Sequence, residues 1–168
     1  SGILQLELAE TIAIKALGLL TTKLPDGSKG FSLVILLTAE GFAPIPVGLG
    51  FTLTGIGGLV ALHRTVRTDV LRDGPKTGTL NSILCPSDPL RNAPQIFSDL
   101  RRVFPPTAGR HVVGPMVQLR WGTPTLLTLD LALLVELPSP VRVVVLGRLQ
   151  VLLPSQAHPL VQIRMDAL

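Results

Sequence analysis

Apolar and polar residues alternate with a period of two along the last third of the chain. Odd positions there are almost all aliphatic, while even positions carry most of the polar and charged side chains. Such alternation is typical of strands that bury one face. Residues 111–167 therefore predict a four-stranded antiparallel meander whose aliphatic face covers the core. The predicted strands are Val112–Trp121, Thr125–Leu137, Val141–Leu153 and Leu160–Met165.

The N-terminal part of the chain shows the same alternation in two stretches. Ile3–Thr22 alternates, with a break at Ala9-Glu10 that allows a bulge, and Phe31–Ala39 alternates again. The segment Pro25–Gly30 between them combines a proline with two glycines, a composition typical of turns. We therefore expect a long β-hairpin over residues 3–40.

Residues 44–110 change in character from strand to helix. Val47–Leu62 is rich in glycine and predicts a short strand with a glycine-mediated bend. Thr65–Asp73 has helical spacing, and a second helix begins after Asn92, with Pro94 in its first turn. The apolar stripe of this second helix consists of Ile96, Phe97, Leu100, Val103 and Phe104.

These elements predict a mainly β fold with antiparallel pairing. An N-terminal hairpin and a C-terminal four-stranded meander are joined by one or two short helices. Residues 1–168 have the length of a single β-rich domain, or of a fragment of a larger protein.

The stretch Phe42–Leu62 carries no charge over 21 residues, which is long enough for a membrane-spanning helix. Its glycines and prolines disfavour that interpretation, because each glycine costs a helix about 1 kcal/mol relative to alanine. The glycine spacing does not fit a dinucleotide fingerprint, and Pro75 in Gly74–Thr77 is incompatible with a P-loop. We expect a glycine-bent strand and no transmembrane helix.

Composition limits the classes of partner. Hydrophobic residues make up 46% of the chain and charged residues 15%, against about 25% charged in ordinary soluble domains. A surface with so few charges is either hidden in a larger assembly or contacts something apolar. The net charge of +4 comes from Lys and Arg spread along the chain without a basic run or an aromatic platform, so nucleic acid is not an expected partner.

Three histidines and one cysteine are the residues best suited to catalysis or metal binding. His63, His111 and His158 lack the spacing of a metal site. Cys85 has no neighbouring histidine or basic helix start that would activate its thiol, so we expect it to be inert. One cysteine forms no internal disulfide, and a free thiol fits a reducing compartment, which favours a cytoplasmic location.

Carboxylates on the meander are the remaining candidates. Asp130 and Glu136 share the polar face, and Glu136 and Arg142 flank one turn, so ion pairs across strands explain them. No nucleophile, base and orienting group occur in a recognised pattern. We therefore expect no enzymatic activity, no metal and no cofactor, unless two or more of these carboxylates and the three histidines converge in a deep pocket.

The aliphatic face of the meander leads to two functional hypotheses. In the first, the chain is a non-catalytic structural or interaction module of a larger β-rich protein. Its edge strands would pair with the rest of that protein or with another copy. In the second, the face lines an apolar groove for a lipid or another long hydrophobic ligand. The floor of that groove would be formed by Leu127, Leu129, Leu131, Leu133, Val143 and Val145.

Ordinary core packing is the expected role of these six floor residues. They would lie against the N-terminal hairpin and the helix that follows Asn92, because open aliphatic faces of this size are rare on soluble monomers. Trp121, the lone tryptophan, shares their parity at a strand end. We therefore expect it to be a core corner residue rather than a binding anchor.

Five segments, taken in order, resemble an uncharacterised bacterial domain family found in very long chains. They are Gly50–Leu59 (GFTLTGIGGL), Phe104–Pro106 (FPP), Val113–Met116 (VGPM), Trp121–Pro124 (WGTP) and Glu136–Pro140 (ELPSP). The resemblance covers residues 45–168. It implies a bacterial origin and a longer parent protein, and it transfers no catalytic residue, because none is established for the family.

Overall fold

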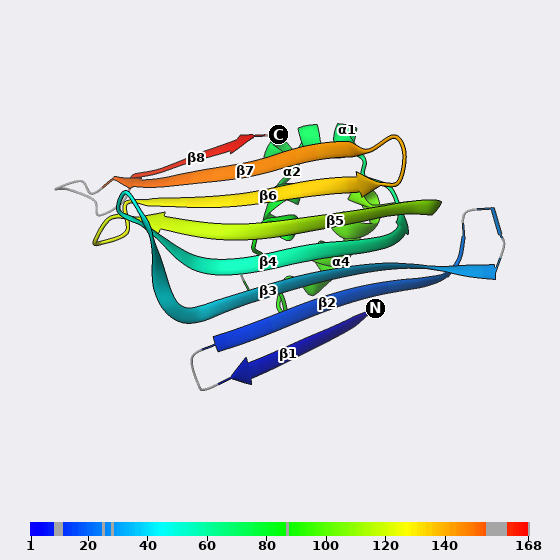
Figure 1. Ribbon diagram of the computed structural model, residues 1–168, viewed down its shortest axis with the longest axis horizontal. Coiled ribbons are helices and arrows are strands. Elements are labelled where there is room, and N and C mark those ends of the chain that lie inside the picture. The colour runs from blue at the N-terminus through cyan, green and yellow to red at the C-terminus, as the bar shows by residue number, and fades with distance from the viewer. Residues whose placement is uncertain (9–11, 25, 28, 87, 154–160, 168) are drawn as a thin grey trace.

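The fold is seen in a computed structural model that describes residues 1–8, 12–24, 26–27, 29–86, 88–153 and 161–167. The described part is a sheet with a helical insert (Figure 1). The strands are β1 (Gly2–Leu8), β2 (Ile12–Lys23), β3 (Lys29–Gly48), β4 (Phe51–Arg64), β5 (Pro106–Trp121), β6 (Leu127–Leu137), β7 (Arg142–Leu153) and β8 (Val161–Ala167). The helices are α1 (Thr68–Arg72), α2 (Gly74–Thr77), α3 (Thr79–Ile83) and α4 (Ala93–Val103).

The eight strands form one antiparallel sheet in chain order, from β1 at one edge to β8 at the other. This arrangement confirms the predicted mainly β, antiparallel class. The predicted hairpin, glycine-rich strand and C-terminal meander are consecutive parts of this single sheet. The start of the last predicted strand, at Leu160, lies outside the described residues.

The prediction of one strand over Ile3–Thr22 is wrong, because this segment forms two paired strands, β1 and β2. Leu6 pairs with Ile14, so even positions lie on the same face in both strands and the alternation has the same parity in β1 and β2. The predicted bulge at Ala9-Glu10 and part of the predicted turn at Pro25–Gly30 lie outside the described residues.

The glycine-rich segment forms a full strand, β4, between β3 and β5. Gly57 shows why glycine is needed in this strand. A Cβ at this position would lie 2.8 Å from the carbonyl oxygen of Leu37 on β3, closer than two such atoms can pack. The uncharged stretch is therefore extended, as the sequence predicts, but its strand is longer than expected.

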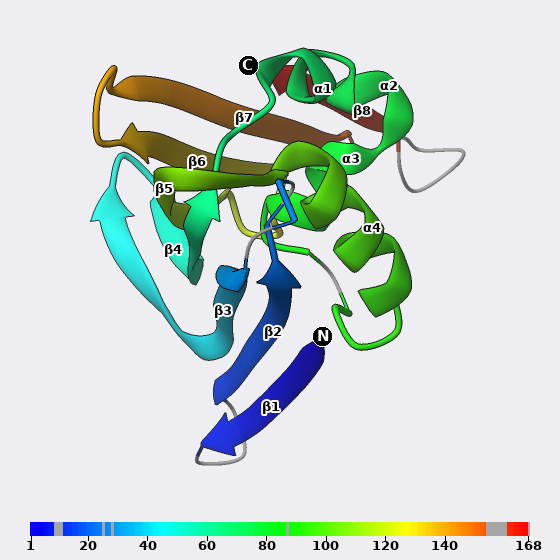
Figure 2. The same cartoon turned by 90° about the vertical axis from the view of Figure 1, so that its right-hand side faces the viewer.

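The four helices form an insert between β4 and β5 and lie on one side of the sheet (Figure 2). α4 confirms the predicted second helix, with Pro94 in its first turn and its apolar stripe buried. α1 confirms the helical spacing of Thr65–Asp73, whereas Asn92 stands at the N-cap of α4 without a side-chain capping bond. The sequence analysis missed α2 and α3, which are helices of four and five residues in a segment expected to be a loop.

The hydrophobic core lies between the helices and one face of the sheet, which we call the helix side. The main buried contributors are Leu17, Leu36, Leu59, Leu71, Ile83, Ile96, Leu100, Val112, Leu134 and Leu146. In β5 to β7 the buried members occupy even positions. The prediction that the odd, aliphatic face covers the core is therefore wrong, because that face points away from the helices.

Charge pairing explains why the even face is the buried one. Asp130, Glu136 and Arg148 on this face are buried, and each is paired with an opposite charge. Asp130 pairs in register with Arg148, and both side chains are more than nine-tenths buried. A buried charge is tolerated when it is paired and hydrogen-bonded, so polarity alone does not identify the solvent face.

Candidate functional site

The opposite face of the sheet, which we call the open face, is a continuous apolar surface across β1 to β7. Its strands are in register, so its side chains form rows that run across the sheet. We name three rows by their β3 or β4 member. The Leu37 row runs Leu4, Ala16, Leu37, Gly58, Pro115, Leu133, Val145; the Ile35 row runs Gly18, Ile35, Val60, Val113, Val135, Val143; the Ile56 row runs Leu6, Ile14, Ala39, Ile56, Val117, Leu131, Gly147.

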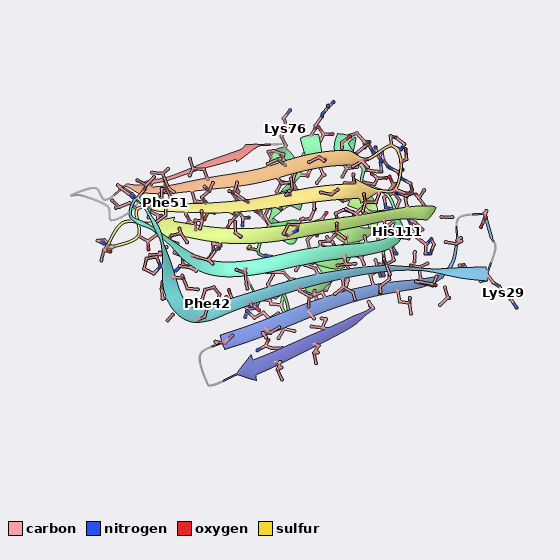
Figure 3. The ribbon with its side chains drawn as sticks, viewed as in Figure 1. Lys29, Phe42, Phe51, Lys76 and His111 are labelled. Atoms are coloured by element: carbon pink, nitrogen blue, oxygen red, sulfur yellow. The ribbon has the colours of Figure 1, made fainter. Side chains whose placement is uncertain are left out.

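None of these three rows contains Asp, Glu, Lys or Arg. In Figure 3 the helices lie behind the sheet, and none of the described strands or helices covers the face turned towards the viewer. The side chains are correspondingly exposed: 60% for Val143, 56% for Val145 and 43% for Leu37. Isolated exposed aliphatic residues are ordinary, but a contiguous apolar surface of this extent marks a site of interaction.

Trp121 lies at one end of the open face rather than in a core corner. Its side chain is 40% exposed, and its indole Nε1 donates a hydrogen bond to the carbonyl oxygen of Leu49 at 3.0 Å. Gly50 makes this contact possible: its φ is +78°, and a Cβ there would lie 2.7 Å from the indole nitrogen. Leu49 itself is 94% exposed, so the end of the sheet is also apolar.

The helix side carries a polar seam that joins the sheet to the insert. Arg148 on β7 pairs with Asp130 on β6 and also donates to Asn81 Oδ1 of α3 at 2.8 Å and to the carbonyl oxygen of Leu84 at 2.9 Å. Gln118 donates to the other oxygen of Asp130 at 2.9 Å. The sequence predicted the cross-strand ion pair of Asp130. The contacts of Arg148 with the insert were missed, since no local pattern links residues so distant in sequence.

Glu136 forms a second buried anchor at the end of β6. Arg110 donates to its carboxylate at 2.7 Å, Arg142 pairs with its second oxygen, and Thr65 donates at 2.6 Å. Burial opposes the charged form of Glu136, but these hydrogen bonds outweigh it and lower its pKa from 4.5 to about 2. The predicted pairing of Glu136 with Arg142 is confirmed. The carboxylate is ionised and fully engaged in structure at neutral pH.

A polar cavity of about 630 Å³ lies between the insert and the helix side of the sheet. Its walls include Asn81, Cys85, Gln118, Asp130 and Arg148. Burial, followed by the charge of Asp130, raises the pKa of the Cys85 thiol to about 12, so the thiol is protonated and a poor nucleophile at neutral pH. The charged groups in the wall bind one another, an arrangement that stabilises the insert.

The structure brings two of the three candidate histidines together. The rings of His63 and His111 make an edge contact with centroids 5.0 Å apart. The backbone N–H of His63 donates to Nδ1 of His111 at 3.2 Å, and the N–H of Gly109 donates to Nδ1 of His63 at 3.1 Å. Both Nδ1 atoms therefore accept a hydrogen bond from the backbone.

The candidate carboxylates do not join this histidine pair. Asp130 and Glu136 lie on the helix side, whereas His111 stands in register with Leu62 and Leu137 on the open face. Among the described residues, no cluster of three or more His, Cys, Asp or Glu could hold a metal ion. His158 lies outside the described residues.

The described helices include none that is both long and apolar enough to cross a bilayer. The chain is thus a one-sided β/α protein, an antiparallel sheet with helices on one face and an apolar surface on the other. It belongs to DUF6603, a family of unknown function whose model matches residues 1–168. The predicted membership in a family of unknown function is therefore confirmed. The family model matches residues 1–168, whereas the predicted resemblance covered only residues 45–168. No curated protein and no solved structure matches the chain.

Proposed function

We propose that this chain is a non-catalytic structural or interaction module whose open face packs against another apolar layer. The observation that supports this proposal is the exposure of three uncharged rows on one face of an eight-stranded sheet. Removing such a surface from water is favourable by roughly 25 cal/mol per Å². Asp130, Glu136 and Arg148 of the helix side already have charged partners within the chain, so the open face is the better candidate for contact.

The sheet edges offer a further mode of contact. β1 is an outermost strand, and its Leu4 and Leu6 are 65% and 49% exposed. An outermost strand presents unpaired backbone groups that another strand can extend. Edge pairing with a longer parent chain and burial of the open face are compatible, because they use different groups of the sheet.

Substitution of an exposed open-face residue tests the proposal. Val145→Glu places a charge in the Leu37 row, on β7, without disturbing the buried core. Leu90→Glu, at a site 43% exposed on the insert, is the matched control. We expect the wild-type chain either to self-associate in light scattering or to bind the apolar dye ANS, and Val145→Glu to weaken both. A monomeric wild type with unchanged dye binding in Val145→Glu would contradict the proposal.

A second candidate function is the binding of a lipid or another long apolar ligand. It is supported by the grouping of Leu131, Leu133 and Val145 with the other predicted floor residues on the adjacent strands β6 and β7 of the open face. Native mass spectrometry of protein purified from cells separates the two candidates. A co-purifying lipid that is lost in Val145→Glu is the expected result for this candidate, and protein without lipid would count against it.

A further inference from the structure

The open face has the dimensions of one side of a stable protein interface. Over β1 to β7, seven strands spaced by about 4.8 Å and counted over about seven residues of each, with a rise of about 3.3 Å per residue, cover roughly 800 Å². Each partner buries about that area in an interface of standard size. Interfaces between identical chains are also more apolar than others, and no charge in the three rows would be desolvated.

A particular two-fold axis makes this face complementary to itself. The axis runs parallel to the strands, above the boundary between β4 and β5, which is the middle of the sheet. Rotation about it lays β5 of the second copy over β4 of the first, β6 over β3 and β7 over β2. Because the axis follows the strand direction, each row faces the same row of the second copy.

Small residues then face large ones along the Leu37 row. Gly58 lies opposite Pro115 of the second copy, Ala16 lies opposite Val145, and Leu37 lies opposite Leu133. Gly58 and Ala16 leave hollows in the surface, and Val145 is among its most exposed side chains. The register therefore sets projecting side chains against hollows, which is what close packing of two sheets requires.

The two neighbouring rows obey the same rule. In the Ile35 row, Gly18 faces Val143 of the second copy. In the Ile56 row, Ile14 faces Gly147 and Ala39 faces Leu131. Every glycine and alanine of β2 to β7 in the three rows thus faces a larger side chain. An axis perpendicular to the strands would instead lay β2 on β2, with its small residues near one another.

Two cavities large enough for a ligand lie away from the centre of this surface. One, of about 630 Å³, is on the helix side, and the other, of about 560 Å³, lies beside Trp121 at the end of the sheet. A third cavity is lined by Ala39 and Ile56, but its volume of about 10 Å³ is too small for a lipid chain. A long apolar ligand is normally bound in a concave site that surrounds it. A broad surface without such a cavity at its centre fits a second sheet better than a lipid chain.

From these observations we propose that two copies of this chain stack open face to open face about the axis between β4 and β5. The two sheets lie about 10 Å apart, as stacked sheets do, and the helical inserts form the outer layers of a four-layer assembly. This inference rests on the proposed function and assigns its partner, a second copy of the chain.

Sedimentation velocity on the whole chain tests the second-copy assignment. We expect the wild type and Leu90→Glu to form a dimer, and Leu37→Glu and Leu133→Lys each to be monomeric, because each dimer would bury two unpaired charges. Burying an unpaired charge weakens an interface by at least about 30-fold. Leu37 and Leu133 face each other across the proposed axis, so mixing the two variants should restore a dimer with one Glu–Lys pair and one unchanged Leu–Leu contact. Circular dichroism establishes that each variant is folded, and Val145→Glu replaces either variant that is not.

Three outcomes would overturn this inference. One is a wild type that stays monomeric at hundreds of micromolar, including one that binds phosphatidylcholine vesicles instead. The second is a dimer that persists in Leu37→Glu. The third is hydrogen exchange in which β1 amides gain protection with concentration, the signature of edge pairing. A monomer that still binds ANS through the open face would end the dimer proposal and leave the interaction module in place.

Discussion

Glu136 shows at the scale of one residue how this fold buries charge. Its side chain has no exposed surface, yet Arg110, Arg142 and Thr65 satisfy its carboxylate. Removing one partner of such a group is costly because the other charges stay behind without a counter-ion. Lys15 and Glu40 form a contrasting pair, in which the carboxylate is 51% exposed and solvent screens the charges.

The first residue-scale prediction concerns Glu136→Gln and its dependence on pH. The folded pKa of Glu136 is about 2, below the ordinary 4.5. The ionised form therefore stabilises the fold above pH 4.5, and this stabilisation is lost as pH falls towards 2. We expect Glu136→Gln to lower the free energy of unfolding by about 3 kcal/mol at pH 7, and the difference from wild type to shrink in acid. Urea unfolding across this pH range measures it.

Glu40→Gln is the matched control, and we expect it to lower the free energy of unfolding by less than about 1 kcal/mol at any pH. Equal losses for the two variants at pH 7 would show that Glu136 is not the anchor described above. A wild-type to Glu136→Gln difference that stays constant down to pH 2 would contradict the lowered pKa.

Part of this residue-scale chemistry can be read from the sequence. Glu136 and Arg142 flank one short turn, and Asp130 faces a cationic strand, so their ion pairs follow from strand alternation and turn position. The third partner of Glu136, Thr65, lies 71 residues away and enters only through the fold. The exposure of Trp121 also could not be predicted, because Trp121 shares the odd, aliphatic parity and the pattern does not show that this face points away from the helices.

At the scale of elements, the attachment of α3 to the sheet depends on Arg148. This side chain reaches from β7 to Asn81 Oδ1 and to the carbonyl oxygen of Leu84 while it pairs with Asp130. Arg64, at the end of β4, makes a similar link by donating to the carbonyl oxygen of Phe104 at 2.6 Å. Long polar side chains from the sheet thus fix the insert at both of its sides.

The element-scale prediction is that Arg148→Met loosens α3 before it loosens the sheet. The change leaves Asp130 buried without Arg148, beside the unpaired carbonyl oxygen of Leu84. We expect it to lower the free energy of unfolding by about 3 kcal/mol or more. Hydrogen exchange should accelerate by at least about 100-fold in α3, and by less in the paired amides of β2 and β3. Arg91→Met is the control, since Arg91 is 84% exposed and should leave exchange unchanged. Uniform acceleration in all elements would contradict a local anchor.

The sequence predicts where the strands and helices lie better than it predicts which face of each strand is buried. Period-two alternation identifies the strands of β5 to β7, and the stripe from Ile96 to Phe104 identifies α4. The choice of the buried face fails because the rule that charged residues face solvent does not hold for Asp130, Glu136 and Arg148. Their burial is made possible by partners on other strands and on the insert, and a strand-by-strand pattern carries no information about them.

At the scale of the whole molecule, the helices cover one face of the sheet and leave an aliphatic face open. The low charge of the chain, 15% of its residues, agrees with the proposed packing of this face against another layer, which would need no charges. The proposed dimer would place both sheets inside and both inserts outside. Neither the family nor the sequence indicates this arrangement, because it depends on which face of the sheet the helices cover.

Methyl NMR with a water-soluble paramagnetic agent tests the central claim most directly. The claim is that Leu37, Val143 and Val145 lie on an open face that contacts another apolar layer, while Leu134 and Leu146 lie in the core. We predict strong relaxation of the first three methyl groups at high dilution, its loss as the protein concentration rises, and none for Leu134 and Leu146 at any concentration. Strong relaxation of Leu134 and Leu146 with protection of Leu37, Val143 and Val145 at high dilution would contradict the account.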